Sequence, residues 1–145
     1  EKSWWEAAEE MGGDIFGKTG FDNSGGNEIV GAAAYEFRDL IAAKRMGAKG
    51  EKFTAMMREI NGIARSYEGQ LGRPEQQRLS WPEAVQEMSL DPIARTAFER
   101  TDSCIVAAAA HRFRRGIMTV KDEGFLFKKM MREINEAVGR YRVGG

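Results

Sequence analysis

The chain has 145 residues, of which 42% are hydrophobic and 30% charged, and its 22 basic and 22 acidic side chains give a formal net charge of zero. This composition is typical of a soluble globular domain, and no apolar run approaches the ~20 residues of a membrane-spanning helix. The only cysteine, Cys104, excludes an internal disulfide, and the first residues lack a leader pattern. We therefore expect a cytoplasmic protein with no membrane segment.

The zero net charge hides an uneven distribution. Residues 1–72 hold nine basic and twelve acidic side chains, whereas residues 73–145 hold thirteen and ten. The contrast is sharper between residues 1–34, with two basic and seven acidic groups, and residues 111–142, with nine and four. Because local charge sets local attraction, the two ends of the sequence favour different partners.

One six-residue sequence, Met-Met-Arg-Glu-Ile-Asn, occurs twice, at 56–61 and at 130–135. The flanking residues also correspond, since Trp4 matches Trp81 and Tyr67 matches Tyr141. The sequence therefore predicts an internal duplication, with repeat one at 1–72 and repeat two at 73–145. Each repeat alone would be marginally stable, so we expect one domain over 1–145.

Each repeat opens with a helix-start pattern, Ser3-Trp4-Trp5-Glu6 in the first and Ser80-Trp81-Pro82-Glu83 in the second. The serine accepts from the backbone N–H three residues later while the glutamate reaches back, which is a capping box. Short helices should follow, ending near Met11 and Met88. We expect Trp4 and Trp81 to point inward, and Trp5, which matches Pro82, to be exposed.

The next segments differ between the repeats. Residues 12–26 are rich in glycine and are predicted to be a loop, whereas residues 89–102 are compatible with a helix. Alanine-rich helices should then run from Glu28 to about Ala48 and from Asp102 to about Thr119, because apolar residues recur in them every four positions.

The last helix of each repeat has the clearest pattern, with apolar residues at spacings of three and four. The two stripes are Phe53, Met56, Met57, Ile60, Ile63, Ala64 and Tyr67, and Phe127, Met130, Met131, Ile134, Ala137, Val138 and Tyr141. Strand patterns are nearly absent. The prediction is an all-α bundle of five or six helices, built from two helix-plus-αα-hairpin repeats related by a pseudo-twofold axis.

Residues 12–19 match the phosphate-loop pattern G-x-x-x-x-G-K-[ST]. This match indicates a nucleotide-binding enzyme only if a buried strand precedes it and a helix follows at once. The flanks here are an acidic helix and a second glycine-rich stretch, and the matching stretch 89–96 has no glycine. We therefore keep nucleotide binding through Gly12–Thr19 as a remote alternative.

Other candidate sites are weaker. The stretch 22–28 is rich in oxygen ligands but lacks the spacing of a calcium loop, so a helix cap at Asn27 or Asn23 is favoured. Cys104 and His111 are two helical turns apart, too far for a catalytic pair, and His111 matches Tyr35 as a partly buried filler. We predict no metal site, no cofactor and no catalytic residue.

Arg58, Glu59 and Asn61 recur as Arg132, Glu133 and Asn135. Two interpretations compete: the groups bond one repeat to the other, or each copy presents the same polar face to a partner. We favour the first, because buried polar bonds that fix register are a known use of such residues.

The basic side chains are the main functional indication. They concentrate on the second hairpin, with a weaker set on the first, and such faces suit a phosphate backbone contacted without sequence preference. The candidate residues for nucleic-acid binding are Arg112, Arg114, Arg115, Lys121, Lys128, Lys129, Arg132, Arg38, Lys44, Arg45 and Arg58. The competing interpretation is a solvated face whose charge nearby carboxylates compensate.

These observations predict a non-enzymatic helical binding or assembly subunit that contacts a nucleic-acid backbone, with RNA or single-stranded DNA favoured, within a ribonucleoprotein or phage-like assembly. The alternative is a protein-interaction adaptor or inhibitor without a nucleic-acid role. In that alternative an exposed Trp5, beside acidic residues, anchors a protein partner, and the charge asymmetry drives docking or self-association.

Overall fold

The structure is a computed structural model that describes residues 2–39, 51–71, 79–114 and 123–143. Within these ranges every regular element is an α-helix, which confirms the predicted all-α fold. The described ranges contain eight helices, so the predicted number of five or six was too low. They are α1 (Trp4–Gly12), α2 (Ile15–Asn23), α3 (Glu28–Glu36), α5 (Glu51–Leu71), α6 (Trp81–Ser89), α7 (Pro92–Thr101), α8 (Cys104–Arg112) and α10 (Glu123–Val143).

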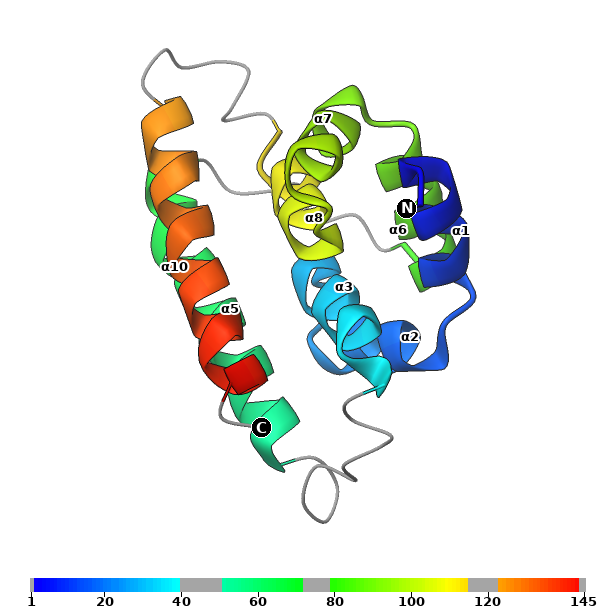
Figure 1. The fold of residues 1–145 in the computed structure, drawn as a ribbon, viewed down its shortest axis with the longest axis horizontal. Helices are drawn as coiled ribbons and strands as arrows, with labels where there is room; N and C mark the ends of the chain where they lie inside the picture. Colours follow the sequence, from blue (N-terminus) through cyan, green and yellow to red (C-terminus); the bar gives the residue numbers. More distant parts are fainter. Residues whose placement is uncertain (1, 40–50, 72–78, 115–122, 144–145) are drawn as a thin grey trace.

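The helices are arranged in three groups, shown from left to right in Figure 1. The long helices α5 and α10 lie side by side at one edge of the molecule, and α1 and α6 pack together at the opposite edge. Between them α3 packs on α8, with α2 against α3 and α7 against α8. The central helices therefore separate the long pair from the α1/α6 pair.

The starts of α1 and α6 confirm both predicted capping boxes. Ser3 accepts from the Glu6 backbone N–H, and the Glu6 side chain accepts from the Ser3 N–H. Ser80 and Glu83 make the same two bonds at α6. Two N–H groups that lack partners within each helix are thus satisfied by local sequence.

Two buried tryptophans join α1 to α6. The Trp4 indole N–H donates to the Met88 carbonyl at 3.2 Å, and the Trp81 indole N–H donates to the Met11 carbonyl at 2.8 Å. Each indole thus adds a second donor to a carbonyl near the end of the other helix, because the Asp14 N–H also donates to the Met11 carbonyl and the Asp91 N–H to the Met88 carbonyl. Both side chains are at most 2% exposed and Trp5 is 51% exposed, as predicted.

The alanine-rich helices form the centre, and each is interrupted at a phenylalanine within its predicted range. The predicted ends near Ala48 and Thr119 lie outside the described residues. Ala32 to Ala34 and Ala107 to Ala110 are almost completely buried where α3 packs on α8. However, α3 ends at Glu36 and α8 at Arg112. The next residues, Phe37 and Phe113, leave helical geometry with ψ of 12° and 18° and bury their rings. Because both phenylalanines continue the four-residue spacing, the pattern did not reveal the turn.

The predicted loop at 12–26 is mostly helix α2, so that prediction was wrong. Asp14 caps α2 by accepting from the Gly17 N–H at 2.9 Å. A Cβ at Gly17 would lie 3.0 Å from the Trp81 ring, and one at Gly20 would lie 2.8 Å from the Ala34 Cβ. These glycines therefore let α2 approach its neighbours closely rather than breaking it. The helix expected within 89–102 is present as α7.

The long helices α5 and α10 confirm the two apolar stripes within the described side chains. Met56, Ile60 and Tyr67 are buried on α5, and Met130, Met131, Ile134 and Ala137 are buried on α10. The two helices run antiparallel. Tyr67 donates to Glu133, and Arg140 donates to Glu59 at 2.9 Å, so paired residue numbers rise on one helix as they fall on the other.

Candidate interaction surfaces

The structure divides the predicted nucleic-acid-binding residues into an internal and an external group. Arg112 is 18% exposed and its Nη1 lies 2.7 Å from Glu28 Oε1, while Arg114 donates to the His111 carbonyl at 3.1 Å. Arg38 donates to the Tyr35 carbonyl and places its guanidinium 4.4 Å from the Tyr35 ring. These three side chains bond groups of the protein itself. Arg115, Lys121, Lys44 and Arg45 lie outside the described residues.

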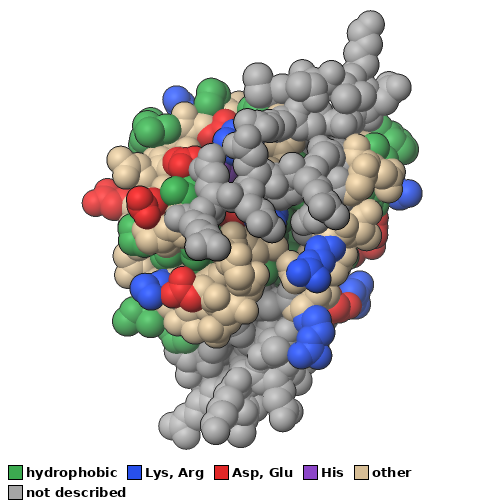
Figure 2. All heavy atoms as spheres, turned by 180° about the vertical axis from the view of Figure 1, so that it is seen from behind, with side chains coloured by type: hydrophobic (Ala, Val, Ile, Leu, Met, Phe, Trp, Pro, Cys, Tyr) green, Lys and Arg blue, Asp and Glu red, His purple; other side chains and the backbone are tan. Residues whose placement is uncertain are grey.

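The external group lies on the long helix pair. Arg58 and Arg65 are seven residues apart on α5, and Lys128 and Arg132 are four residues apart on α10, so each of these pairs shares one side of its helix. Lys and Arg side chains gather on the right-hand side of Figure 2, where the long helices lie in this reversed view. We use the name basic face for six exposed residues, Arg58, Arg65, Lys128, Lys129, Arg132 and Arg140.

The duplicated Arg, Glu and Asn set has a divided role. Glu59 and Glu133 accept from Arg140 and Tyr67 across the α5/α10 contact, which agrees with the favoured interpretation of bonds between the predicted repeats. Asn61 instead accepts from Asn27 at 2.8 Å, within residues 1–72. Arg58 and Arg132 are exposed and belong to the basic face.

A buried ionic cluster surrounds His111, which was predicted to be only a filler. His111 is 5% exposed, and its Nδ1 lies 2.8 Å from Asp91 Oδ2. Its Nε2 lies 4.0 Å from Glu28 Oε2 and 3.5 Å from Arg114 Nη1. The cluster joins the start of α7 to α3 and to the end of α8. Sequence alone gave no indication of it, because Asp91 and Glu28 lie 20 and 83 positions from His111 along the chain.

The phosphate-loop match does not have phosphate-loop geometry. Ile15 to Thr19 are the first residues of α2, Gly17 faces the Trp81 ring, and the Lys18 ammonium lies 2.8 Å from Asp22 Oδ2. The described residues contain no strand to precede such a loop. The stretch therefore serves as a helix start, as the absence of glycine from the matching stretch 89–96 indicated.

The oxygen-rich stretch before α3 is also a helix cap. The Asn27 side chain accepts from the Ile29 N–H at 2.9 Å, which confirms the predicted cap at Asn27. Within the described ranges no group of three or more His, Cys, Asp or Glu side chains is placed to hold a metal ion.

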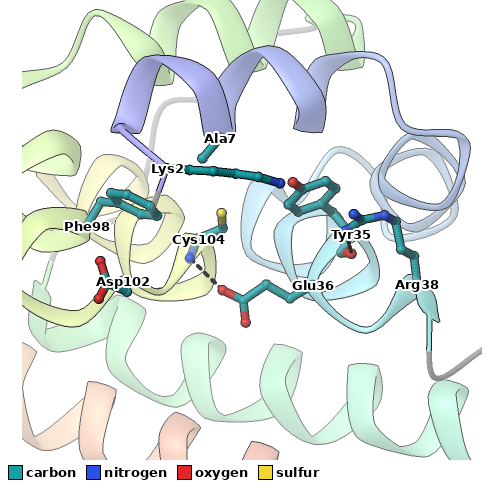
Figure 3. Close-up of a pocket in the computed structure, with 8 residues that line it drawn as sticks. All are labelled: Lys2, Ala7, Tyr35, Glu36, Arg38, Phe98, Asp102 and Cys104. Atoms are coloured by element: carbon teal, nitrogen blue, oxygen red, sulfur yellow. Dashed lines mark hydrogen bonds between the residues drawn. The ribbon is translucent and has the colours of Figure 1, made fainter.

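A shallow pocket of about 400 Å³ opens between α1, α3 and α8, and Figure 3 shows its lining. Glu36 Oε1 accepts from the Cys104 N–H at 2.6 Å, so a carboxylate of α3 bonds the first turn of α8. Burial raises the pKa of the Cys104 thiol to about 12, and a protonated thiol is a poor nucleophile. The other lining residues are Lys2, Ala7, Tyr35, Arg38, Phe98 and Asp102. The pocket thus lies at a joint between helices, and burial keeps its thiol protonated.

The α1/α6 pair presents an acidic surface. Glu6, Glu9 and Glu83 are exposed there, Glu87 is half-buried, and neither helix contains a lysine or arginine. Hydrogen bonds from the Ser3 and Ser80 backbones lower the pKa of Glu6 and Glu83, which keeps these carboxylates ionised. We use the name acidic face for the exposed residues Glu6, Glu9, Glu83, Trp5 and Leu90, of which Trp5 and Leu90 are 51% and 66% exposed.

Comparison with known proteins identifies no relative from which a function could be inferred. No protein-family model, no curated protein and no solved structure matches the chain. Among the described helices, none combines the length and the apolar character needed to cross a membrane.

Proposed function

We propose that the protein is a non-enzymatic binding subunit that holds a nucleic-acid backbone against its basic face. The observation that carries the proposal is the exposure of the six cationic side chains of that face on one antiparallel helix pair. Lysine and arginine side chains presented along neighbouring helices attract phosphates and release condensed counterions on binding. Glu59 and Glu133 on the same pair are engaged with Arg140 and Tyr67, whereas Glu136, one turn after Arg132, is exposed.

The chemistry of the basic face indicates weak sequence preference. Its described side chains are long cations without an exposed aromatic platform apart from Phe125, which is 70% exposed near the start of α10. Phosphate contacts position a protein on nucleic acid but carry no sequence information. We favour RNA or single-stranded DNA, because Phe125 offers a ring on which one unpaired base can stack.

A matched pair of double variants tests the proposal. K128E/R132E reverses two charges on the basic face, whereas K18E/R95E makes the same net change at exposed side chains of α2 and α7. We expect K128E/R132E to weaken binding to single-stranded RNA and to lower the slope of log affinity against log salt by about two, while K18E/R95E retains the wild-type slope. Equal slopes for the two variants, or no binding by wild type at low salt, would refute it.

The second candidate function is a protein-interaction adaptor. Trp5 is 51% exposed on the acidic face, and large exposed aromatics are frequent anchors of protein interfaces. The variant Trp5→Ala separates the two candidates, because it leaves the basic face intact. Loss of a protein partner with unchanged RNA binding would favour the adaptor.

We also propose that the two repeats, 1–72 and 73–145, are related by a pseudo-twofold axis. Corresponding helices pack on each other in three pairs, α1 with α6, α3 with α8 and α5 with α10. The reciprocal bonds of Trp4 to Met88 and of Trp81 to Met11 support the same relation. Such an axis would relate Arg58 to Arg132, whereas the other four cations of the basic face correspond to uncharged residues on the opposite long helix.

A further inference from the structure

The acidic and basic faces occupy opposite edges of the molecule. In Figure 1 the α1/α6 pair lies at the right and the α5/α10 pair at the left, with the central helices between them. The two faces therefore cannot meet within one molecule. We propose that the acidic face of one molecule binds the basic face of a second copy of this chain, head to tail.

The acidic face has the composition of a docking surface rather than of a solvated helix pair. The charged residues within α1 and α6 are all negative, whereas an ordinary solvated face mixes both signs. Lys2, just before α1, pairs with Glu10, and Glu6, Glu9 and Glu83 lie outside that pair. Apolar side chains lie at both ends of the pair. The Trp4 to Met88 bond places Trp5 and Leu90 at one end, and Ile15, 77% exposed, lies just after α1 at the other. An exposed tryptophan such as Trp5 would add an apolar anchor to the charge attraction in a docked complex.

The basic face supplies the complement. Lys128, Lys129 and Arg132 fall within two turns of α10, and their charge is opposite to that of Glu6, Glu9 and Glu83 on α1 and α6. Phe125 lies one turn before them and is 70% exposed, which provides an apolar contact for the Trp5 end of the acidic face. Complementary charges attract the two molecules, and together with an apolar anchor they fix the register in which the faces dock.

The net charge favours this partner over a strongly charged one. With 22 basic and 22 acidic side chains, two copies do not repel each other as wholes, and attraction between the unlike faces governs how they approach. Because the two interacting surfaces differ, the contact is heterologous. Repetition of such a contact produces a ring if the rotation closes and an open chain if it does not.

Self-association and nucleic-acid binding use the same basic face, so they compete. The proposed self-association does not depend on the proposed nucleic-acid function, and the two fail separately. An acidic-face variant should lose self-association and keep RNA binding, whereas K128E/R132E should lose both.

The first test is the mass of the wild-type protein by sedimentation velocity across protein concentration and salt. At about 0.01 M salt the screening length is about 30 Å, and we expect species larger than the monomer whose population rises with concentration. At about 1 M salt screening falls to about 3 Å, and we expect monomer. A monomer throughout the low-salt series would overturn the proposal.

The second test mixes two variants that each damage one face. E9K/Q86K adds positive charge to exposed positions on α1 and α6 without touching the capping boxes, and K128E/R132E damages the basic face. We expect each to be monomeric alone at low salt and the equimolar mixture to associate, because the intact basic face of one meets the intact acidic face of the other. Circular dichroism checks that both variants fold.

Two further results would contradict the head-to-tail contact. An interface between like faces predicts that one of the two variants self-associates as the wild type does. The control T96K/E99K carries the same charge change as E9K/Q86K on exposed positions of α7, so it should associate normally. Loss of association in this control would show that the charge alone, and not the acidic face, is responsible.

Discussion

Two aspartates that precede short helices, Asp14 and Asp91, have different structural roles. Each caps the helix that follows, since Asp14 accepts from the Gly17 N–H and Asp91 accepts from the Ile93 N–H. Only Asp91 also bonds a histidine, with its second oxygen 2.8 Å from His111 Nδ1. The Asp91 side chain is 8% exposed. One carboxylate thus caps a helix and holds the buried ionic cluster together.

This difference predicts unequal costs for the same substitution. Asp14→Ala should lower the free energy of unfolding by about 1 kcal/mol, the usual effect of losing a helix cap. Asp91→Ala should cost about 2 kcal/mol more, because it also removes a buried hydrogen bond to an ionisable partner. Urea denaturation of the two variants measures the difference. An equal loss of unfolding free energy in both would mean that the bond between Asp91 and His111 does not stabilise the fold.

At the residue scale, the sequence predicted the burial or exposure of side chains whose environment is set by nearby residues or by helix periodicity. Trp4 and Trp81 were expected inside and Trp5 outside, because their positions relative to the capping boxes set their directions. The ion pair of Arg112 with Glu28 was not predictable, since 84 residues separate the partners. Arg112 therefore looked like a surface cation in the sequence although it is 18% exposed in the fold.

At the scale of helices, the wrong prediction of a loop at 12–26 came from its glycines. Gly17, Gly20 and Gly31 lie in α2 and α3 where neighbouring side chains leave no room for a Cβ. Glycine lowers the intrinsic stability of a helix, so the stretch 12–26 resembled a loop. Tertiary packing outweighed that propensity, because the glycines allow Trp81 and α3 to approach the backbone. The stripes of α5 and α10 contain no such conflict and were predictable from spacing alone.

Two Gly→Ala substitutions separate packing from propensity. A Cβ at Gly31 would lie 2.6 Å from the Trp81 ring, so Gly31→Ala should destabilise by about 1–3 kcal/mol through overpacking. Gly62 on α5 has no atom within 4 Å of such a Cβ, so Gly62→Ala should stabilise by about 0.5–1 kcal/mol. Thermal unfolding reports both changes. A shift of the same sign for both would contradict the role assigned to Gly31.

At the scale of the whole molecule, the order of the helices places unlike charges at opposite edges. The charge difference between residues 1–34 and 111–142 was visible in the sequence, but its direction in space was not. The three pairs α1/α6, α3/α8 and α5/α10 each join distant parts of the chain, and only these contacts decide which charges are neighbours. They also engage Arg112 and Arg114 with other groups of the protein, so Arg58, Lys128, Lys129 and Arg132 are the predicted nucleic-acid-binding residues that the described part of the chain exposes.

The stability of the fold should fall at alkaline pH, because Tyr67 and Cys104 keep protons in the folded state that they lose in the unfolded chain. Donation to Glu133 raises the pKa of Tyr67 to about 12, and burial raises the pKa of Cys104 to about 12, against ordinary values of 10.0 and 9.0. Between the ordinary and the raised values the unfolded chain has lost these protons and the folded chain has kept them. The free energy of unfolding should therefore be constant with respect to these groups below about pH 9 and fall steadily toward pH 12. Guanidinium denaturation at stepped pH measures this decline.

The variant Tyr67→Phe isolates one of these two protons. It removes the hydroxyl that donates to Glu133, so it should be less stable than wild type at neutral pH. Because only the Cys104 thiol then remains to titrate between its ordinary and raised pKa, the variant should lose stability more slowly than wild type above about pH 10. The same stepped denaturation series compares the two slopes. An unchanged slope would show that Tyr67 does not keep its proton in the folded state.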